Sequence, residues 1–310
     1  MQVKFWGVRG SYPVPGPNTN RYGGNTSCVQ VDPGDGNVFV FDAGTGIRKL
    51  GQELVAGLFG RGEGRCHVLI SHTHWDHIQG LPFFAPLYVA GNRVSLYARQ
   101  RDVHLETLFK SQTQDPYFSV SMEEVAAAVE YRELLEGASF EVGVSRVRCA
   151  RLNHPYIAIG YRIDAEGSSV AYVSDTAPFD RIVLGFEFIS ARPDLEAGPS
   201  ASDAVQLAEM RDGVIDLCRG ADLVVYDTMF EMEEYQACAH WGHSAPEHAV
   251  ALCQAAGAKC LALFHHHPDR HDDAQDDILE RVRRSTSLPV IAAAEGLVVE
   301  LGAGRMEVKG

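Results

Sequence analysis

The chain has 310 residues, of which 45% are hydrophobic and 22% are charged, an ordinary composition for a soluble globular protein with a sizeable core. Its formal net charge of −14 argues against broad surfaces for nucleic acid or anionic membranes, although it does not exclude a local basic groove. No apolar run approaches the length of a membrane span, and the N-terminus starts like a strand rather than a signal peptide.

The first part of the chain predicts three strands and a helix. Val3–Phe5 begins the first strand, Cys28–Val31 alternates as a half-buried strand does, and Val38–Phe41 forms the third. The third strand ends at Asp42, close to two glycines, so this carboxylate either forms an Asx turn or belongs to a site. Apolar residues at helical spacing then predict a helix over Ile47–Leu58.

A cluster of metal-binding residue types follows the buried strand predicted at Cys66–Ile70. His72, His74, Asp76 and His77 lie within six residues, and imidazole and carboxylate groups suit zinc and its first-row neighbours. His72 and His74 share a face of extended backbone, whereas Asp76 and His77 are adjacent and must diverge. One ion cannot easily take all four side chains, but two ions can. The alternative is a polar loop in which histidines cluster by chance.

The middle of the chain predicts mixed structure and then a β-meander. A strand is expected over Arg93–Tyr97, with helices over Arg101–Phe109 and Ser121–Val129, the second because Ser-Met-Glu-Glu is a plausible helix start. Four strands with glycine-containing turns follow, at Phe140–Val142, Arg146–Ala150, Tyr156–Ile163 and Ser169–Val173.

Two site candidates stand at the ends of these meander strands. His154 precedes Pro155, which cannot donate to a β-ladder and therefore marks a strand end or bulge. Asp175 comes shortly after the last strand of the meander, separated from it only by Ser174. A single histidine is more often a satisfied polar residue than a ligand, but the upstream cluster favours a metal-binding role for His154.

The C-terminal part of the chain alternates helices and strands. Ser190–Ser200 is a variable-looking segment that marks no domain boundary, and a helix from Ser202 to Arg219 follows it. A buried strand, Ala221–Tyr226, ends at Asp227. The acidic residues Glu231, Glu233 and Glu234 are predicted to form a solvated loop.

Two further histidine positions stand out near the C-terminus. His243 precedes a helix predicted to start with a capping box of Ser244 and Glu247 and to end at Gly257. The strand Cys260–Phe264 leads into three consecutive histidines, of which one is a strong ligand candidate. A helix and two closing strands are predicted at Asp272–Arg284, Val290–Ala293 and Leu297–Leu301.

The seven cysteines are scattered, odd in number and free of any Cys-x-x-Cys motif. A disulfide framework or a cysteine-based zinc knuckle is therefore not expected. Most of them lie in apolar runs, as buried free thiols do, which predicts a cytoplasmic protein.

The pattern His72-x-His74-x-Asp76-His77 resembles the signature of the metallo-β-lactamase superfamily. The resemblance implies an α/β fold, an αββα sandwich of two mixed β-sheets, and it covers essentially the whole chain as one domain, residues 1–310. It also implies two divalent metal ions, zinc first and manganese as the alternative.

The same resemblance assigns roles to the strand-end residues. The first ion would be held by His72, His74 and His154, and the second by Asp76, His77 and His265, with Asp175 bridging both. His265 is chosen over His266 because it directly follows its strand. Asp42 would support the metal-binding loop without binding an ion.

The residue type at the bridging position indicates which branch of the superfamily the chain resembles. A bridging Asp175 is typical of dinuclear phosphodiesterases and ribonuclease Z-like members, whereas β-lactamases of this fold use cysteine there. Tyr226-Asp227-Thr228 and Gly242-His243-Ser244 resemble ribonuclease Z, in which an acidic residue orients a histidine that protonates the leaving oxygen; here Asp227 replaces the usual glutamate. The chain lacks a glycine- and basic-rich arm for gripping tRNA. Two N-terminal motifs, at residues 5–11 and 22–28, resemble bacterial small-substrate phosphodiesterases.

These features together predict a dinuclear-metal phosphodiesterase. A metal-bridging hydroxide would attack a small cyclic or diester phosphate, such as a cyclic nucleotide or cyclic ribose phosphate, and the expected catalytic residues are Asp76, Asp227 and His243. The alternatives are a ribonuclease Z-like RNA nuclease, a lactonase, or a non-catalytic metal-binding or sensing module. The expected partner is the small phosphodiester, without a membrane or extensive nucleic-acid binding, and a homodimer is left open.

Overall fold

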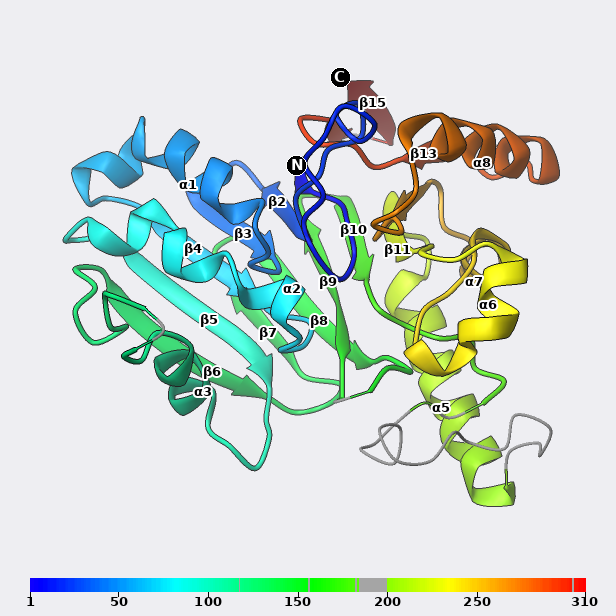
Figure 1. Cartoon of the computed structure of the whole chain (residues 1–310), viewed down its shortest axis with the longest axis horizontal. Helices are drawn as coiled ribbons and strands as arrows, with labels where there is room; N and C mark the ends of the chain where they lie inside the picture. Colours follow the sequence, from blue (N-terminus) through cyan, green and yellow to red (C-terminus); the bar gives the residue numbers. More distant parts are fainter. Residues whose placement is uncertain (117, 156, 182, 184–199, 303) are drawn as a thin grey trace.

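Two mixed β-sheets pack face to face, with helices on the outer side of each, in the computed structural model of the chain (Figure 1). This arrangement confirms the predicted αββα sandwich. The structure describes residues 1–116, 118–155, 157–181, 183, 200–302 and 304–310. Residues 190–199 of the predicted variable segment, and Tyr156 at the start of a predicted strand, lie outside these described residues.

The first sheet has the strand order β15-β14-β1-β2-β3-β4-β5-β6 among the described residues. Its strands are β1 (Gln2–Gly7), β2 (Cys28–Asp32), β3 (Asn37–Phe41), β4 (Arg65–Leu69), β5 (Arg93–Arg99), β6 (Ala128–Leu134), β14 (Val298–Gly302) and β15 (Arg305–Lys309). Pairing is antiparallel from β15 to β3 and parallel from β3 to β6. The carboxyl ends of β3 and β4 therefore lie side by side.

The second sheet has the order β13-β12-β11-β10-β9-β8-β7. Its strands are β7 (Ser139–Val142), β8 (Ser145–Arg151), β9 (Ile159–Ala165), β10 (Ser168–Val173), β11 (Leu223–Asp227), β12 (Leu261–Phe264) and β13 (Val290–Ala292). The strands β10 to β13 are parallel, and β7 to β10 are antiparallel. The carboxyl ends of β10, β11 and β12 thus meet at one edge of this sheet, where α/β folds commonly place ligands.

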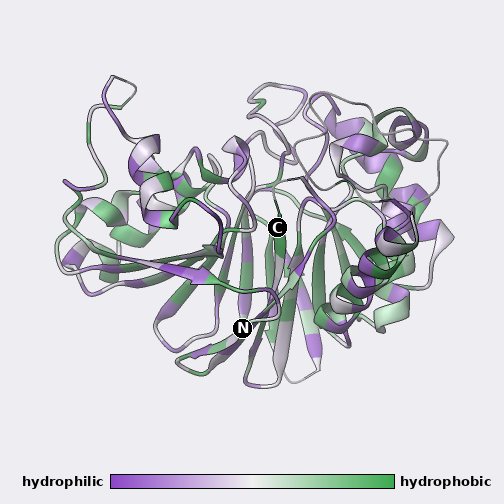
Figure 2. Ribbon diagram, turned by 90° about the horizontal axis from the view of Figure 1, so that it is seen from below, coloured by the Kyte–Doolittle hydropathy of each residue, from purple (hydrophilic) through white to green (hydrophobic). Residues whose placement is uncertain are grey.

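Helices cover the outer side of each sheet (Figure 1). Beside the first sheet are α1 (Ile47–Val55), α2 (Trp75–Ile78) and α3 (Leu105–Gln112); beside the second are α5 (Ala201–Cys218), α6 (Met232–Cys238), α7 (Pro246–Ala256) and α8 (Asp272–Ser285). Figure 2 shows hydrophobic colour along many of the strands and mixed colour on the outer helices. Within the described ranges, no helix combines the length and the apolar character needed to cross a bilayer.

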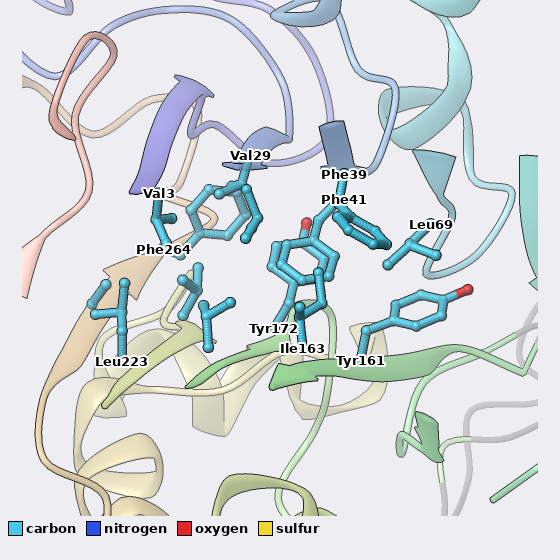
Figure 3. Packing of buried hydrophobic residues seen from close by; sticks show 14 of the residues in the cluster. Val3, Val29, Phe39, Phe41, Leu69, Tyr161, Ile163, Tyr172, Leu223 and Phe264 are labelled. Carbon is cyan, nitrogen blue, oxygen red and sulfur yellow. The ribbon is translucent and has the colours of Figure 1, made fainter. Parts of the chain in front are cut away.

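The main core lies between the two sheets. Val3, Phe39 and Phe41 of the first sheet face Tyr161 and Tyr172 of the second, and all are buried (Figure 3). The Phe41 and Tyr172 rings are nearly parallel, with centroids 4.8 Å apart. Burial of apolar side chains at about 25 cal/mol per Å² is the main stabilising contribution to such a core. It holds the strand ends of both sheets, and the residues that follow them, in fixed positions.

The helix predicted over Ser121–Val129 is wrong. Residues 121–127 form turns, and Ala128–Leu134 is strand β6, which pairs in parallel with the whole of β5. The expected helix-starting contact exists, because the Ser121 N–H donates to Glu124 Oε2 over 3.0 Å. Pairing with β5 nevertheless overrides the helical propensity of the alanine-rich stretch.

Three smaller predictions near the C-terminus also need correction. The acidic segment begins helix α6 and is not a loop, although Glu233 and Glu234 are exposed as expected. Glu234 Oε2 also lies 2.5 Å from the buried Arg270 guanidinium. Ser244 does not cap α7; its hydroxyl donates to the Thr176 carbonyl oxygen, and the Ala245 N–H donates to His248 Nδ1 instead. The closing strand β15 was not predicted at all.

Candidate metal centre

The predicted site residues lie just beyond the carboxyl ends of strands from both sheets. Asp42 follows β3, Asp175 is two residues beyond β10, and His265 follows β12. All three have left-handed backbones, with φ of 58°, 56° and 59°. Such a conformation costs a non-glycine residue roughly 1–3 kcal/mol and is concentrated at functional sites. The sharp turn after each strand leaves these side chains within one buried cluster.

One group in this cluster consists of His72, His74 and His154. The Nε2 atom of His72 lies 2.9 Å from His74 Nδ1, and the Nε2 atom of His154 lies 3.2 Å from the same nitrogen. The His154 Nδ1–H donates to the Gly242 carbonyl oxygen over 2.8 Å, and His72 Nδ1 lies 3.1 Å from the Ser71 hydroxyl. Because their Nδ1 atoms are used in this way, His72 and His154 present Nε2 lone pairs toward His74.

The second group consists of Asp76, His77, Asp175 and His265. Their ligand atoms lie within 4.8 Å of one another, and all four side chains are buried. The His77 Nε2 atom is 3.2 Å from Asp76 Oδ2, and the His265 Nε2 atom is 3.4 Å from that same oxygen. Of the three consecutive histidines, the structure therefore places His265 in the cluster.

Asp175 lies between the two groups. Its Oδ2 atom is 3.6 Å from His72 Nε2 and 3.8 Å from His154 Nε2. Its Oδ1 atom is 3.3 Å from His77 Nε2 and 3.2 Å from His265 Nε2. One oxygen of the carboxylate thus faces each group.

Asp42 holds the Ser71–His77 loop through hydrogen bonds with four donor groups. Its Oδ1 accepts from the Ser71 N–H, and its Oδ2 accepts from the Ser71 hydroxyl, the Tyr172 hydroxyl and His77 Nδ1 over 2.7 to 2.8 Å. The carboxylate is completely buried. It therefore fixes the His77 ring so that Nε2 faces Asp76 and Asp175, as partners of metal-binding histidines do.

The chemistry of these side chains fits divalent metal ions. His77 Nε2 and His265 Nε2 are buried without a hydrogen-bond partner among the described residues, a costly state that a bound cation would relieve. Burial and neighbouring imidazoles hold the pKa of His72 and of His154 well below the usual range, so both rings are neutral and can bind a metal. Burial raises the pKa of Asp175, but His265 and His77 lower it by more, so the net direction is downward and the carboxylate stays ionised.

A histidine–aspartate pair lies beside this cluster. His243 Nδ1 is 2.9 Å from Asp227 Oδ2, and it is 4.0 Å from Asp175 Oδ2. Asp227 is fixed at the end of β11, because its oxygens also accept from the Thr176 and Met229 N–H groups. Burial lowers the pKa of His243, but Asp227 and Asp175 raise it by more, so the net direction is upward.

Comparison with known proteins places this geometry in a family. Residues 37–188 match the Beta-lactamase superfamily domain. Residues 37–188 thus form a domain of the metallo-β-lactamase superfamily. The matched range contains Asp42, the His72–His77 loop, His154 and Asp175, whereas Asp227, His243 and His265 lie beyond it.

The similarity to other proteins extends over most of the chain. Ribonuclease Z of Haloarcula marismortui is 23% identical and the alignment covers 96% of each chain; ribonuclease Z of Synechococcus sp. (strain CC9605) is 27% identical over 86% of this chain and 87% of that one. The human short-form tRNase Z structure has a TM-score of 0.64 at 20% identity, covering 98% of this chain and 100% of that one. A diphosphatase of the PhnP family has a TM-score of 0.63 at 19% identity, covering 97% and 98%. These structures support the superfamily fold.

The loop after β1 supports the superfamily site in a way that the sequence did not predict. The Ser11 N–H donates to Asp76 Oδ2 over 2.8 Å, and Gly10 lies against the His265 ring. The loop is anchored by Arg9, which is fully buried and donates to the Gly23 and Arg270 carbonyl oxygens over 2.8 Å. The signal in the sequence is the motif at residues 5–11, which contains Arg9, Gly10 and Ser11.

We expect the Gly10→Ala variant to lose metal from the group that contains His265. A Cβ atom at Gly10 would lie 2.5 Å from His265 Cε1, so the imidazole must move. Displacing a ligand should weaken metal affinity by about 10- to 100-fold or more, the effect of losing a ligand's supporting partner. Elemental analysis after dialysis against a weak chelator measures it.

Gly16→Ala is the matched control in the same loop. A Cβ atom there would have Thr19 Oγ1 at 4.0 Å as its nearest neighbour, so metal content should not change. Retention of full metal content by Gly10→Ala would show that the contact with His265 is unimportant.

Proposed function

We propose that the chain is a metal-dependent hydrolase that uses two ions to cleave a small phosphodiester, either a cyclic phosphate or an open diester. The observation that carries the proposal is the Asp175 carboxylate, which has one oxygen beside each histidine group. A carboxylate shared by two metal sites is suited to phosphoryl chemistry, in which the attacking and leaving oxygens both need stabilisation.

The residues that would hold the ions follow from the two groups. His72, His74 and His154 would hold one ion, and Asp76, His77 and His265 the other, with Asp175 shared. A mixed set of imidazole and carboxylate ligands favours zinc, with manganese as the alternative. When bound, such ions supply a water nucleophile at neutral pH and positive charge next to the phosphoryl oxygens.

His243 is proposed to supply the proton for the leaving group. Hydrolysis joins a water oxygen to phosphorus and breaks one ester bond, which yields a phosphate monoester and an alcohol. Asp227 accepts the Nδ1 proton of His243, so Nε2 is the nitrogen that can give a proton to the departing oxygen. Asp227 also keeps the ring oriented and stabilises its charged form.

The size of the substrate is proposed from charge. The net charge of −14 disfavours a long polyanion, and a small diester carries only one negative charge at neutral pH. A protein with a similar fold is a diphosphatase of the PhnP family, which is compatible with phosphoryl chemistry at such a site. RNA cleavage is the second candidate, because the relatives of similar length are named ribonuclease Z.

Two further proposals concern the domain organisation of the chain and the cellular compartment in which it works. We propose that residues 1–310 act as one domain. The seven cysteines are all free, and six are buried, which supports a reducing compartment such as the cytoplasm.

We expect the protein to bind about two metal ions per chain, because the ligands form two groups with a shared carboxylate. Elemental analysis after reconstitution with zinc or manganese measures the number. The same samples should be assayed with bis-p-nitrophenyl phosphate, cyclic nucleotides, a lactone and a tRNA precursor. A single ion per chain would contradict the dinuclear site, and turnover of the lactone alone would contradict the phosphodiesterase.

A further inference from the structure

Two of the three tryptophans in the chain are exposed, and both adjoin the metal centre. Trp6 is buried, and its indole N–H donates to Gln30 Oε1 over 3.0 Å. Trp75 and Trp241 are 59% and 51% exposed. Large aromatic side chains are usually buried for most of their area, so exposure at a functional site indicates a binding surface.

Trp75 lies within the segment that contributes side chains to both ligand groups. It is the first residue of helix α2 and stands between His74 and Asp76, which belong to different ligand groups. Because both neighbours face the metal centre and are themselves largely buried, the position of Trp75 relative to the centre is fixed by the backbone of α2.

Trp241 lies in a second segment beside the centre, between helices α6 and α7. It ends the short 3₁₀ helix Ala239–Trp241, and the following residue, Gly242, accepts a hydrogen bond from His154 Nδ1. The Trp241 ring packs edge-on against Phe230 with centroids 6.2 Å apart, and Phe230 packs against His243 at 5.7 Å. The second indole is therefore one aromatic ring away from the proposed proton donor.

We propose that Trp75 and Trp241 form a stacking subsite for the base of a nucleoside phosphodiester whose phosphate lies at the metal centre. The inference rests on the proposed phosphodiesterase function and names its substrate class. Bases stack on indole faces irrespective of base identity, and one such contact contributes about 1–3 kcal/mol, or roughly 5- to 100-fold in affinity. The chain's net charge of −14 favours a mononucleotide-sized ligand over an RNA strand.

Adenosine 5′-monophosphate and ribose 5-phosphate test the subsite, because both carry the pentose and its 5-phosphate but only the first carries a base. Each is titrated into zinc-loaded protein, and indole fluorescence is recorded together with calorimetric affinity. We expect adenosine monophosphate to bind at least about fivefold more tightly and to quench the fluorescence, with buried Trp6 as the constant background. Equal affinity of the two ligands would overturn the proposal without any variant.

Single variants locate the base. Trp75→Ala and Trp241→Ala should each lower the preference for adenosine monophosphate, and Trp75→Phe should retain most of it. Leu58→Ala is the control, because Leu58 is 47% exposed but lies shortly before β4, at the opposite end of that strand from the metal-binding loop. An unchanged preference in both tryptophan variants would refute the subsite.

Two further experiments, with adenosine and with single-stranded RNA, distinguish this inference from the proposed function. Adenosine should quench the metal-free protein as well, because stacking does not need the phosphate. Quenching by adenosine with no hydrolysis of any phosphodiester would remove the proposed function and keep the subsite, whereas hydrolysis without any base preference would do the reverse. A single-stranded RNA that binds more tightly than adenosine monophosphate, with a steep loss of affinity in salt, would overturn the mononucleotide class.

Discussion

Asp175→Ala should abolish phosphodiester hydrolysis and lower the metal content of the protein. Both histidine groups would lose a carboxylate oxygen at once, because Oδ2 faces His72 and His154 while Oδ1 faces His77 and His265. Losing even an outer partner of a ligand costs about 10- to 100-fold in metal affinity or activity, so losing a shared ligand should cost more. Metal content by elemental analysis and turnover of bis-p-nitrophenyl phosphate are the measurements.

Asp164→Ala provides the control for Asp175→Ala. Asp164 is a half-buried residue of β9 that pairs with Arg162 over 2.8 Å, away from the ligand groups. Its replacement should leave metal content and turnover near the values of the unaltered protein. If Asp175→Ala still binds two ions with unaltered affinity, the shared position of this carboxylate has no role in metal binding.

His243→Ala should lower turnover by roughly 10²- to 10⁴-fold, the contribution of a general acid, while metal content stays unchanged. The reason is the geometry of the pair: Asp227 takes Nδ1 at 2.9 Å and leaves Nε2 for the substrate. An alkoxide leaving group departs poorly without a proton at neutral pH. Steady-state kinetics with an alkyl phosphodiester, beside elemental analysis of the same sample, measures the effect.

The leaving group provides the internal control for His243→Ala. p-Nitrophenolate departs without protonation, so the loss of turnover should be much smaller with a p-nitrophenyl ester than with an alkyl ester. Equal losses with both esters, or a loss of metal, would reject the proton-donor role and leave His243 as a packing residue beside Phe230.

The sequence predicted most of this architecture because its signals are local. Strands such as Val38–Phe41 and Cys260–Phe264 are short apolar runs, and the structure has them within one residue at each end as β3 and β12. The placement of His265 followed from a rule of the same kind, since the residue directly after a buried strand lies at the sheet edge. The family resemblance was also carried by a contiguous motif.

The predictions that were wrong or missing concern contacts between residues far apart in the sequence. The segment after Ser121 has helical composition, but Ala128–Leu134 forms a strand because it pairs with β5. The Ser11 N–H reaches Asp76 across 65 positions, and the Gly242 carbonyl reaches His154 across 88. Periodicity and propensity contain no information on such contacts, because a backbone group is present at every position whatever its side chain.

The origin of the ligands has a consequence for the integrity of the sandwich. His72, His74 and His77 follow a strand of the first sheet, whereas Asp175 and His265 follow strands of the second. A bound ion would therefore tie the two sheets together as a cross-link, closing a long loop of the chain in the way that a disulfide does. Ligand binding to the folded state alone increases the free energy of unfolding. The seven cysteines of the protein are free thiols and form no disulfide. In a reducing compartment, a bound metal would therefore provide the cross-link that a disulfide provides elsewhere.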